Sequence, residues 1–94
     1  MAVKIFIKRK VKSENIMELT SLLKKLRSLT INQQGYISGE TLRRVDVPDE
    51  CMVISTWRTV EDWKAWVKNE KRIAVQNEID RLLGEETEYA IYEA

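Results

Sequence analysis

The sequence contains no histidine, and this absence excludes more chemistry than any other feature of its composition. Without an imidazole there is no His-ligated metal, no Ser–His or Cys–His nucleophile pair and no histidine general base. The single cysteine, Cys51, excludes an internal disulfide and a metal site built from cysteines. We therefore expect no metal site.

The chain also lacks an excess of charge of either sign and any long apolar run. Its 16 Lys and Arg residues against 15 Asp and Glu residues give a net charge of +1. Proteins that bind nucleic acid usually carry a strong basic excess, so we expect no nucleic-acid partner. No apolar run approaches the length of a membrane span, and residues 1–10 interleave charged with apolar residues, unlike a signal peptide. We expect no membrane association and a cytoplasmic location.

A length of 94 residues predicts a single domain that spans residues 1–94. Such a short chain buries only roughly 60–65% of the surface that its unfolded form exposes. Its hydrophobic core is therefore marginal, and oligomerisation is a natural way to enlarge it.

Alternating and helical patterns predict four strands and two helical regions. The predicted elements are a strand at 2–11, a helix capped by Ser13 that ends within 30–34, a hairpin of strands 36–45 and 51–57 with a turn at 46–50, a helical region with a Thr59–Asp62 capping box that continues past Asn69 to Gly84, and a strand at 87–92. This βαββαβ order is the ferredoxin-like α+β arrangement.

Two further patterns concern surfaces. The basic cluster of Lys8, Arg9, Lys10 and Lys12 is interpreted as a solvated strand end rather than an anion site. The apolar side of the second helical region beyond Asn69 is predicted to consist of Ile73, Val75, Ile79, Leu82 and Leu83.

The predicted strands carry apolar residues on both of their faces. In the first strand Ile5 is followed by Phe6, and in the third Val53 lies between Met52 and Ile54. A sheet that is apolar on both faces is covered on both faces. Because the helices cover only one face, the simplest cover for the other is a second copy of the chain, which predicts a homodimer.

The stretch Thr56–Trp66, followed by Asn69 and Glu70, resembles the signature of antibiotic biosynthesis monooxygenase domains. In those domains a strand that ends in Trp runs into a capped helix, and a His or Trp follows nine residues after the first Trp. The resemblance implies a dimeric α+β barrel, in which two sheets pack face to face. It also implies relatives of several kinds: cofactor-free oxygenases of polycyclic phenols or quinols, haem-degrading enzymes, and proteins without an assigned activity.

The haem-degrading type uses an Asn on the first strand, a Trp on the second helical region and a His further along. Carried over by position, Trp66 matches the Trp, whereas Ile7 stands near the Asn position and Gln76 near the His position. No imidazole is present to hold the iron, so we expect no haem degradation.

Trp66 is the candidate catalytic residue, because an indole N–H in an apolar pocket can donate a hydrogen bond to a substrate oxygen. The alternative is that Trp66 only anchors the core, as Trp57 is expected to do. Trp63, Asn69 and Tyr36 are candidate substrate-binding residues, although Asn69 also fits a helix cap and Tyr36 also fits cross-strand packing. Surface positions are expected for Arg43, Arg44 and Arg58.

Two functions remain open. The first is a cofactor-independent monooxygenase that acts on a small aromatic phenol or quinol. The alternative is a non-catalytic dimeric module that binds a small apolar or aromatic ligand or serves a regulatory role. The source of a general base separates the two, because without histidine it must be a shifted carboxylate, tyrosine or lysine, or the substrate must ionise unaided.

Overall fold

The structure is a computed structural model that describes residues 2–93. Its elements in chain order are β1 (Val3–Lys10), η1 (Ser13–Asn15), α1 (Ile16–Thr30), β2 (Tyr36–Arg43), β3 (Glu50–Trp57), α2 (Val60–Val67), α3 (Glu70–Leu83) and β4 (Glu88–Glu93). The predicted βαββαβ order is confirmed, with the second helical region divided into α2 and α3. Met1 and Ala94, which the predicted domain includes, lie outside the described residues.

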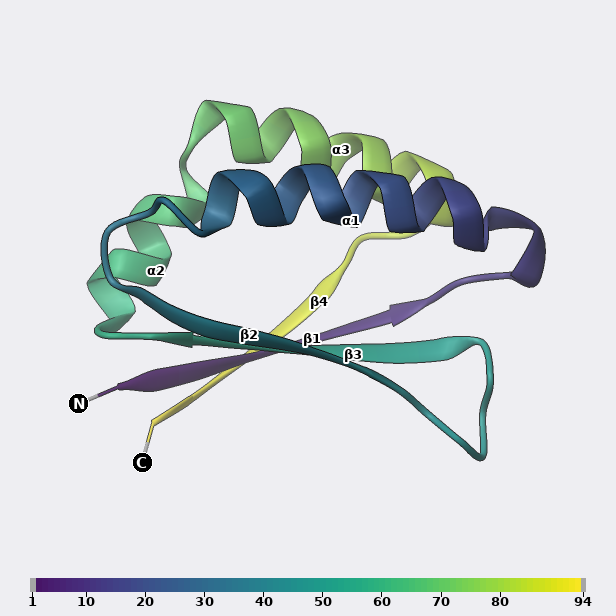
Figure 1. The fold of residues 1–94 in the computed structure, drawn as a ribbon, viewed down its shortest axis with the longest axis horizontal. Coiled ribbons are helices and arrows are strands. Elements are labelled where there is room, and N and C mark those ends of the chain that lie inside the picture. The colour runs from purple at the N-terminus through teal and green to yellow at the C-terminus, as the bar shows by residue number, and fades with distance from the viewer. Residues whose placement is uncertain (1, 94) are drawn as a thin grey trace.

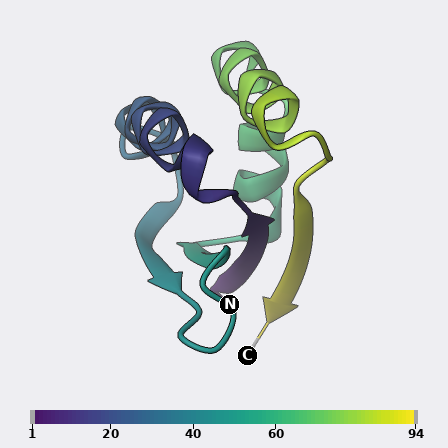
Figure 2. The same ribbon diagram turned by 90° about the vertical axis from the view of Figure 1, so that its right-hand side faces the viewer.

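The strands form one antiparallel sheet with the order β2-β3-β1-β4, which is the predicted ferredoxin-like arrangement. The central strand β1 pairs with β3 on one side and with β4 on the other. Val3 lies opposite both Trp57 and Glu93, so the start of β1 lies beside the end of β4 (Figure 1). All the helices lie on one face of the sheet, which leaves the other face open (Figure 2).

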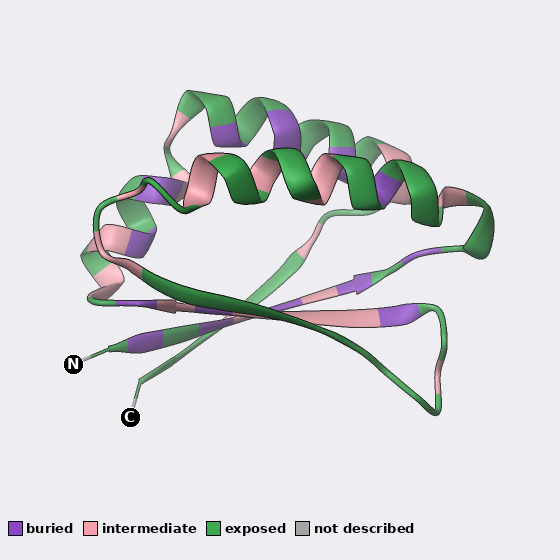
Figure 3. Cartoon of the chain, viewed as in Figure 1, coloured by how far each residue is buried: buried purple, intermediate pink, exposed green. Residues whose placement is uncertain are grey.

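The covered face of the sheet follows the two-residue period of β1. Val3, Ile5, Ile7 and Arg9 are all buried beneath the helices, whereas the residues between them are not (Figure 3). The three apolar members pack with the tryptophans of β3 and α2, and a second cluster joins α1 to α3. Each large apolar side chain buried in this way stabilises the fold by roughly 1.5–3 kcal/mol.

The open face of the sheet also carries apolar residues, as the sequence predicts. Phe6, Met52, Ile54, Ala90 and Tyr92 lie side by side on β1, β3 and β4 according to the strand register, and Lys4 and Lys8 of β1 flank them on the same face. The rings of Phe6 and Tyr92 meet edge to face with their centroids 5.0 Å apart. Tyr92 nevertheless keeps 60% of its surface exposed.

The helices α2 and α3 both begin at their predicted caps. The Thr59 hydroxyl oxygen accepts a hydrogen bond from the backbone N–H of Asp62 at 3.1 Å. The side-chain oxygen of Asn69 accepts from the backbone N–H groups of Lys71 and Arg72 at 2.9 and 3.1 Å. Each cap satisfies amides that a helix start leaves free, and the Asn69 cap explains why the helical region divides at that residue.

The predicted cap of the first helix is wrong. Ser13 opens the short 3₁₀ turn η1, and no side chain caps either η1 or α1. The residue that directly precedes α1 is Asn15, whose backbone is already near-helical with φ −104° and ψ −1°. A capping residue needs an extended backbone, so the tight turn displaces the cap that Ser13 would otherwise provide.

The predicted apolar side of α3 is wrong at one position. Ile73 is 40% exposed, and Arg72 is buried beside it. The buried residues of α3 are Arg72, Val75, Gln76 and Ile79. They are three and four residues apart and therefore share one face of the helix, so the position of α3 on the sheet turns Ile73 outward.

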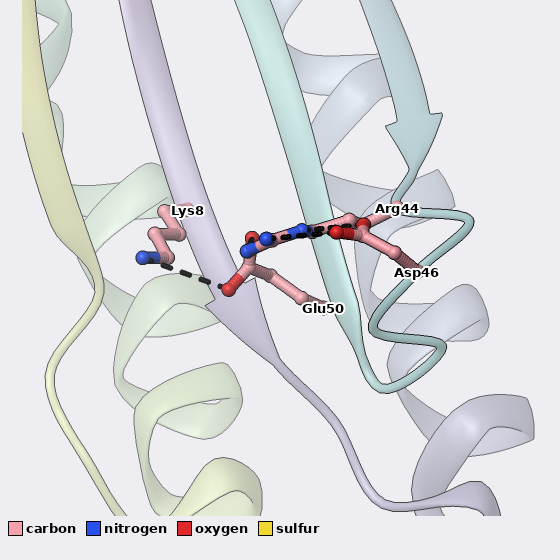
Figure 4. Close-up of polar contacts among 4 residues, drawn as sticks. All are labelled: Lys8, Arg44, Asp46 and Glu50. Atoms are coloured by element: carbon pink, nitrogen blue, oxygen red, sulfur yellow. Dashed lines mark hydrogen bonds and ion pairs between the residues drawn. The ribbon is translucent and has the colours of Figure 1, made fainter.

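The hairpin between β2 and β3 is closed by ion pairs. Arg44 pairs with Asp46 at 2.7 Å and with Glu50 at 3.1 Å, and Lys8 of β1 pairs with Glu50 at 3.6 Å (Figure 4). The strand β2 ends at Arg43, two residues before the predicted end at Val45, which is 94% exposed. The turn therefore begins earlier than predicted, directly after Arg43.

Candidate active site

A cavity of about 80 Å³ lies between the covered face of the sheet and the helices. The sheet contributes residues from all four strands, and the helices contribute residues from α1, α2 and α3. The residues that line it are Ile7, Arg9, Leu23, Leu26, Arg27, Thr30, Tyr36, Gly39, Glu40, Thr41, Val53, Ser55, Trp63, Trp66, Arg72, Gln76 and Tyr89. The exposed members lie on α1, β2 and β4, so the cavity reaches solvent at the sheet edges.

Aromatic rings form one wall of this cavity. The ring of Trp57 is fully buried behind the wall, stacked on Trp66 with the centroids 6.3 Å apart, and its N–H donates to the Ser55 hydroxyl at 2.7 Å. Trp63 meets the same ring edge to face at 5.8 Å, and Tyr36 does so at 5.5 Å. Trp57 thus has the packing role that the sequence predicts, and it holds three rings that line the cavity or border it.

The structure brings together three of the four predicted site residues. Trp66, Trp63 and Tyr36 all line the cavity. Trp66 is 4% exposed, and within residues 2–93 its indole N–H makes no hydrogen bond, unlike that of Trp57, which donates to Ser55. Asn69 does not line the cavity, because its side chain caps α3.

Gly35 positions Tyr36 at the entry to β2. Its φ of 85° is left-handed, and a Cβ at this position would overlap the side chain of Asp62 at the start of α2. The Gly35 carbonyl also accepts a hydrogen bond from the Arg58 N–H at 2.7 Å. Only glycine allows this close approach between the α1–β2 connection and the β3–α2 connection, which sets the place of Tyr36 against Trp57.

Two buried arginines line the cavity beside the aromatic wall. Arg9 is 3% exposed and Arg72 is 6% exposed. The interpretation of Arg9 as part of a solvated strand end is therefore wrong, because Arg9 continues the buried parity of Ile5 and Ile7. Its neighbours in the basic cluster do stay at least partly exposed, and Arg43, Arg44 and Arg58 are exposed as predicted.

A polar network joins these arginines to β4. Arg72 donates to the Tyr89 hydroxyl at 2.7 Å, and its guanidinium lies 5.7 Å from the Trp63 ring centroid and 5.5 Å from that of Tyr89. Arg9 makes only one long contact, a donation to the side-chain oxygen of Gln76 at 3.5 Å. The Gln76 amide in turn donates to Asp80 at 2.9 Å.

The protonation states of the site follow from burial. Burial raises the pKa of Tyr89 above its usual value, against the lowering effect of the Arg72 and Arg9 charges. Tyr89 is therefore a neutral phenol near pH 7 and not a base. Burial also lowers the pKa of Arg9, although a guanidinium stays charged at any physiological pH.

Metal ligands and a reactive thiol are not features of the described chain. Within residues 2–93 there is no group of three or more His, Cys, Asp or Glu side chains placed to hold a metal ion. Cys51 is half-buried, and burial raises the pKa of its thiol, which disfavours the nucleophilic thiolate. Over the same residues, no helix has the length and apolar content that crossing a bilayer requires.

Comparison with known proteins relates this arrangement to a family. The family model for antibiotic biosynthesis monooxygenase matches residues 2–78. The chain belongs to the antibiotic biosynthesis monooxygenase family. No curated protein has a sequence that matches this chain closely enough to count as a relative.

Solved structures share the fold of this antibiotic biosynthesis monooxygenase domain almost from end to end. A conserved protein from Methanosarcina mazei Go1 has a TM-score of 0.90 at 22% identity, over 99% of this chain and 92% of that one. SnoaB, a cofactor-independent oxygenase from Streptomyces nogalater, has a TM-score of 0.82 at 15% identity, over 99% and 92%. Rv0793 from Mycobacterium tuberculosis has a TM-score of 0.86 at 13% identity, over 100% and 95%. At these identities the likeness establishes the fold alone.

The site of this antibiotic biosynthesis monooxygenase domain includes both positions at which the haem-degrading pattern is interrupted. Ile7, near the expected Asn position, and Gln76, near the expected His position, both line the cavity together with Trp66. The cavity therefore includes the three positions to which the resemblance points, with Ile7 and Gln76 near the places of Asn and His.

Sequence reasoning missed Arg9, Arg72 and Tyr89 as site residues. The signal for Arg9 was the strand alternation, which places it on the same face as Ile7. The signal for Arg72 was its spacing of three and seven residues from Val75 and Ile79. For both arginines the charge suggested an exposed side chain. The periodicity of the strand or helix, which decides which way a side chain points, indicated the buried face instead.

Proposed function

We propose that this chain is a cofactor-independent monooxygenase that oxidises a small aromatic phenol or quinol. The observation that carries the proposal is the Trp66 indole, which lines a cavity beneath the sheet with its N–H free of hydrogen bonds within residues 2–93. Family membership supports the reaction class. The buried donor supplies what an ionised substrate needs, which is a fixed hydrogen bond to its oxygen in a site that excludes most water.

The proposed reaction takes its electrons from the substrate. The phenol or quinol loses its proton, and the resulting anion transfers electrons to molecular oxygen. One oxygen atom enters the product, the second is reduced to water, and the ring is oxidised to a quinone. The protein binds the ring against Trp63 and Tyr36, with one of its oxygens toward Trp66.

Oxygen uptake tests this function directly. We expect the purified protein, treated with chelator and free of flavin, to consume oxygen when mixed with single-ring quinols. Mass spectrometry should find one atom of isotopically labelled oxygen in the product. The control is the same quinol with heat-denatured protein, which reports autoxidation. Uptake that never exceeds this control, over a panel of phenols and quinols, contradicts the proposal.

The open face of the sheet supports a homodimer as the working form. A monomeric protein of this mass exposes about 5,700 Å², whereas this chain exposes 6510 Å². The surplus of roughly 800 Å² equals one partner's share of a standard interface. A broad groove on this face, lined by apolar residues such as Phe6, Met52 and Tyr92, is the place for a second copy.

The second candidate is a ligand-binding module without turnover, and one observation favours it. The phenol nearest to the arginines, Tyr89, has a pKa raised by burial and so is no base near neutral pH. In that case the same small ring binds in the cavity but no oxygen is consumed. A binding measurement beside the uptake assay separates the two candidates.

Haem is expected to survive contact with this protein. There is no histidine to hold the iron. Ile7, near the Asn position, has no polar group that could form a hydrogen bond with a ligand of the iron. When the protein is mixed with haem and a reductant in air, the Soret band should remain as it is in a sample without protein. A steady loss of the band together with a defined open tetrapyrrole product contradicts this expectation.

A further inference from the structure

The arginines of the cavity carry positive charge that the described chain does not neutralise. Neither Arg9 nor Arg72 forms a salt bridge within residues 2–93. The Nε atom of Arg9 is buried and has no hydrogen-bond partner in that range. Glu40, which is exposed on β2, is the residue of this cavity lining that carries a carboxylate. The two guanidinium groups therefore lie on the cavity with unfilled capacity to donate hydrogen bonds.

Such an arrangement destabilises the fold unless something else compensates for it. A buried charge without a partner costs several kcal/mol, and buried polar atoms are normally hydrogen-bonded. Arg72 is partly compensated by Trp63 and by its hydrogen bonds to Tyr89 and to the Val67 carbonyl oxygen at 3.4 Å. Arg9 has only its 3.5 Å contact with Gln76.

The acidic side chain whose charge acts on Arg9 is already engaged elsewhere. The carboxylate of Asp80 accepts hydrogen bonds from Gln76 at 2.9 Å and from the Thr87 hydroxyl at 2.9 Å. Its charge raises the pKa of Arg9, but the two side chains form no salt bridge within residues 2–93. The structure thus leaves the cavity side of Arg9 free.

Tyr89 is the point at which the two positive charges converge. Its hydroxyl oxygen accepts the 2.7 Å hydrogen bond from Arg72, and the charges of both Arg72 and Arg9 act on it. Since the oxygen accepts from Arg72, the hydroxyl hydrogen remains available to another acceptor. Two cations and one neutral donor at the same end of a cavity match the needs of a single oxyanion.

We propose that Arg9, Arg72 and Tyr89 form an oxyanion site that binds an acidic phenol or enol as its anion. This proposal rests on the proposed function in one respect, namely that the ligand is an aromatic ring that carries an oxygen. The phenol releases its proton to solvent water, and the two guanidinium groups hold the phenolate that remains. The protein therefore needs no general base, which accounts for a site of this family without histidine.

The size of the cavity limits the ligand. A cavity of about 150 Å³ holds one benzene molecule in another protein, whereas this cavity measures about 80 Å³. A single ring therefore enters oxygen first, with its far end at the rim near the exposed residues Arg27 and Glu40. Larger fused ring systems do not fit the arginine end.

The test uses 4-nitrophenol, which is yellow only as its phenolate. We expect the pKa of the bound phenol, read from its absorbance, to lie about one to three units below that of the free phenol in the same buffer. Each unit corresponds to tenfold tighter binding of the anion over the neutral form. The methyl ether 4-nitroanisole, which cannot ionise, should bind at least tenfold more weakly at neutral pH.

Substitutions identify the charges that cause the shift. Arg72→Gln and Arg9→Gln should each lower the affinity for the phenolate about tenfold or more and reduce the pKa shift, whereas Arg58→Gln, an exposed arginine outside the cavity, should change neither. Since each cavity variant removes a buried charge without a carboxylate partner, its Tm should stay equal or rise, whereas an arginine with a purely structural role would lower it. Tyr89→Phe, which keeps the ring, provides the same comparison if an arginine variant fails to fold.

The outcomes separate this site from the proposed function, because the assay contains no oxidation step. A shifted phenol pKa without oxygen uptake supports the oxyanion site and counts against the monooxygenase. Oxygen uptake with an unshifted pKa does the opposite. A 4-nitrophenol that does not bind, or that binds equally well to Arg72→Gln and Arg9→Gln, overturns the oxyanion site.

Discussion

Replacement of Trp66 by phenylalanine is expected to lower the rate of quinol oxidation about a hundredfold or more while the protein stays folded. The substitution removes the indole N–H of a residue that lines the cavity, and loss of a single oxyanion donor has an effect of this size in other enzymes. Most of the ring volume and its stacking on Trp57 remain, so the loss of stability should be about 1–2 kcal/mol. A Tm several degrees lower is then expected.

Steady-state oxygen uptake and thermal unfolding of the same preparation measure both effects. Trp57→Phe is the matched control, because it removes an indole N–H that donates to Ser55 and does not line the cavity. This control should lower the Tm and retain most of the rate when assayed well below its Tm. If Trp66→Phe turns over at the rate of the unmodified protein, Trp66 is only a core anchor and its catalytic role is rejected.

A lysine at Ile54 is expected to split the homodimer and to destabilise the protein. Ile54 of β3 lies opposite Phe6 of β1 near the centre of the open face. On β1 the residues two before and two after Phe6 are Lys4 and Lys8, so this part of the face already carries two positive charges. In a two-fold symmetric interface each substitution occurs twice, so two like charges would be buried close together. Such a pair costs several kcal/mol, which weakens association at least about thirtyfold.

Light scattering and thermal unfolding follow this effect. We expect the unmodified protein to have twice its chain mass at micromolar concentration, and Ile54→Lys to have the monomer mass with a lower Tm. Met17→Lys is the control, because Met17 is 86% exposed on α1, away from the open face of the sheet. A monomer mass for the unmodified protein removes the basis for the dimer.

The fold was largely predictable because regular patterns in this sequence agree with one another. Alternation identified β1, and the two caps at Thr59 and Asn69 were located from short polar signals that act only over one helical turn. The errors lie where a neighbouring element changes a local rule. A 3₁₀ turn displaced the cap expected at Ser13, and the packing of α3 on the sheet turned Ile73 outward.

The candidate site was only partly predictable, for a different reason. Trp66, Trp63 and Tyr36 are large rings that the family motif or the strand pattern marks, and the fold brings them to one cavity. Arg9 and Arg72 are identified only by the direction in which their side chains point, and direction depends on how the sheet and α3 are packed. A residue type that is normally exposed then escapes notice when it is turned inward.

The central place of β1 in the sheet also matters while the chain is being made. Its partners β3 and β4 are encoded far downstream, so this first strand leaves the ribosome with both edges unpaired and apolar side chains on both faces. Such segments are prone to join other chains before their own partners arrive. The cations Lys4, Lys8, Arg9 and Lys10 interrupt its apolar residues and repel a second nascent strand, which makes them gatekeepers against aggregation.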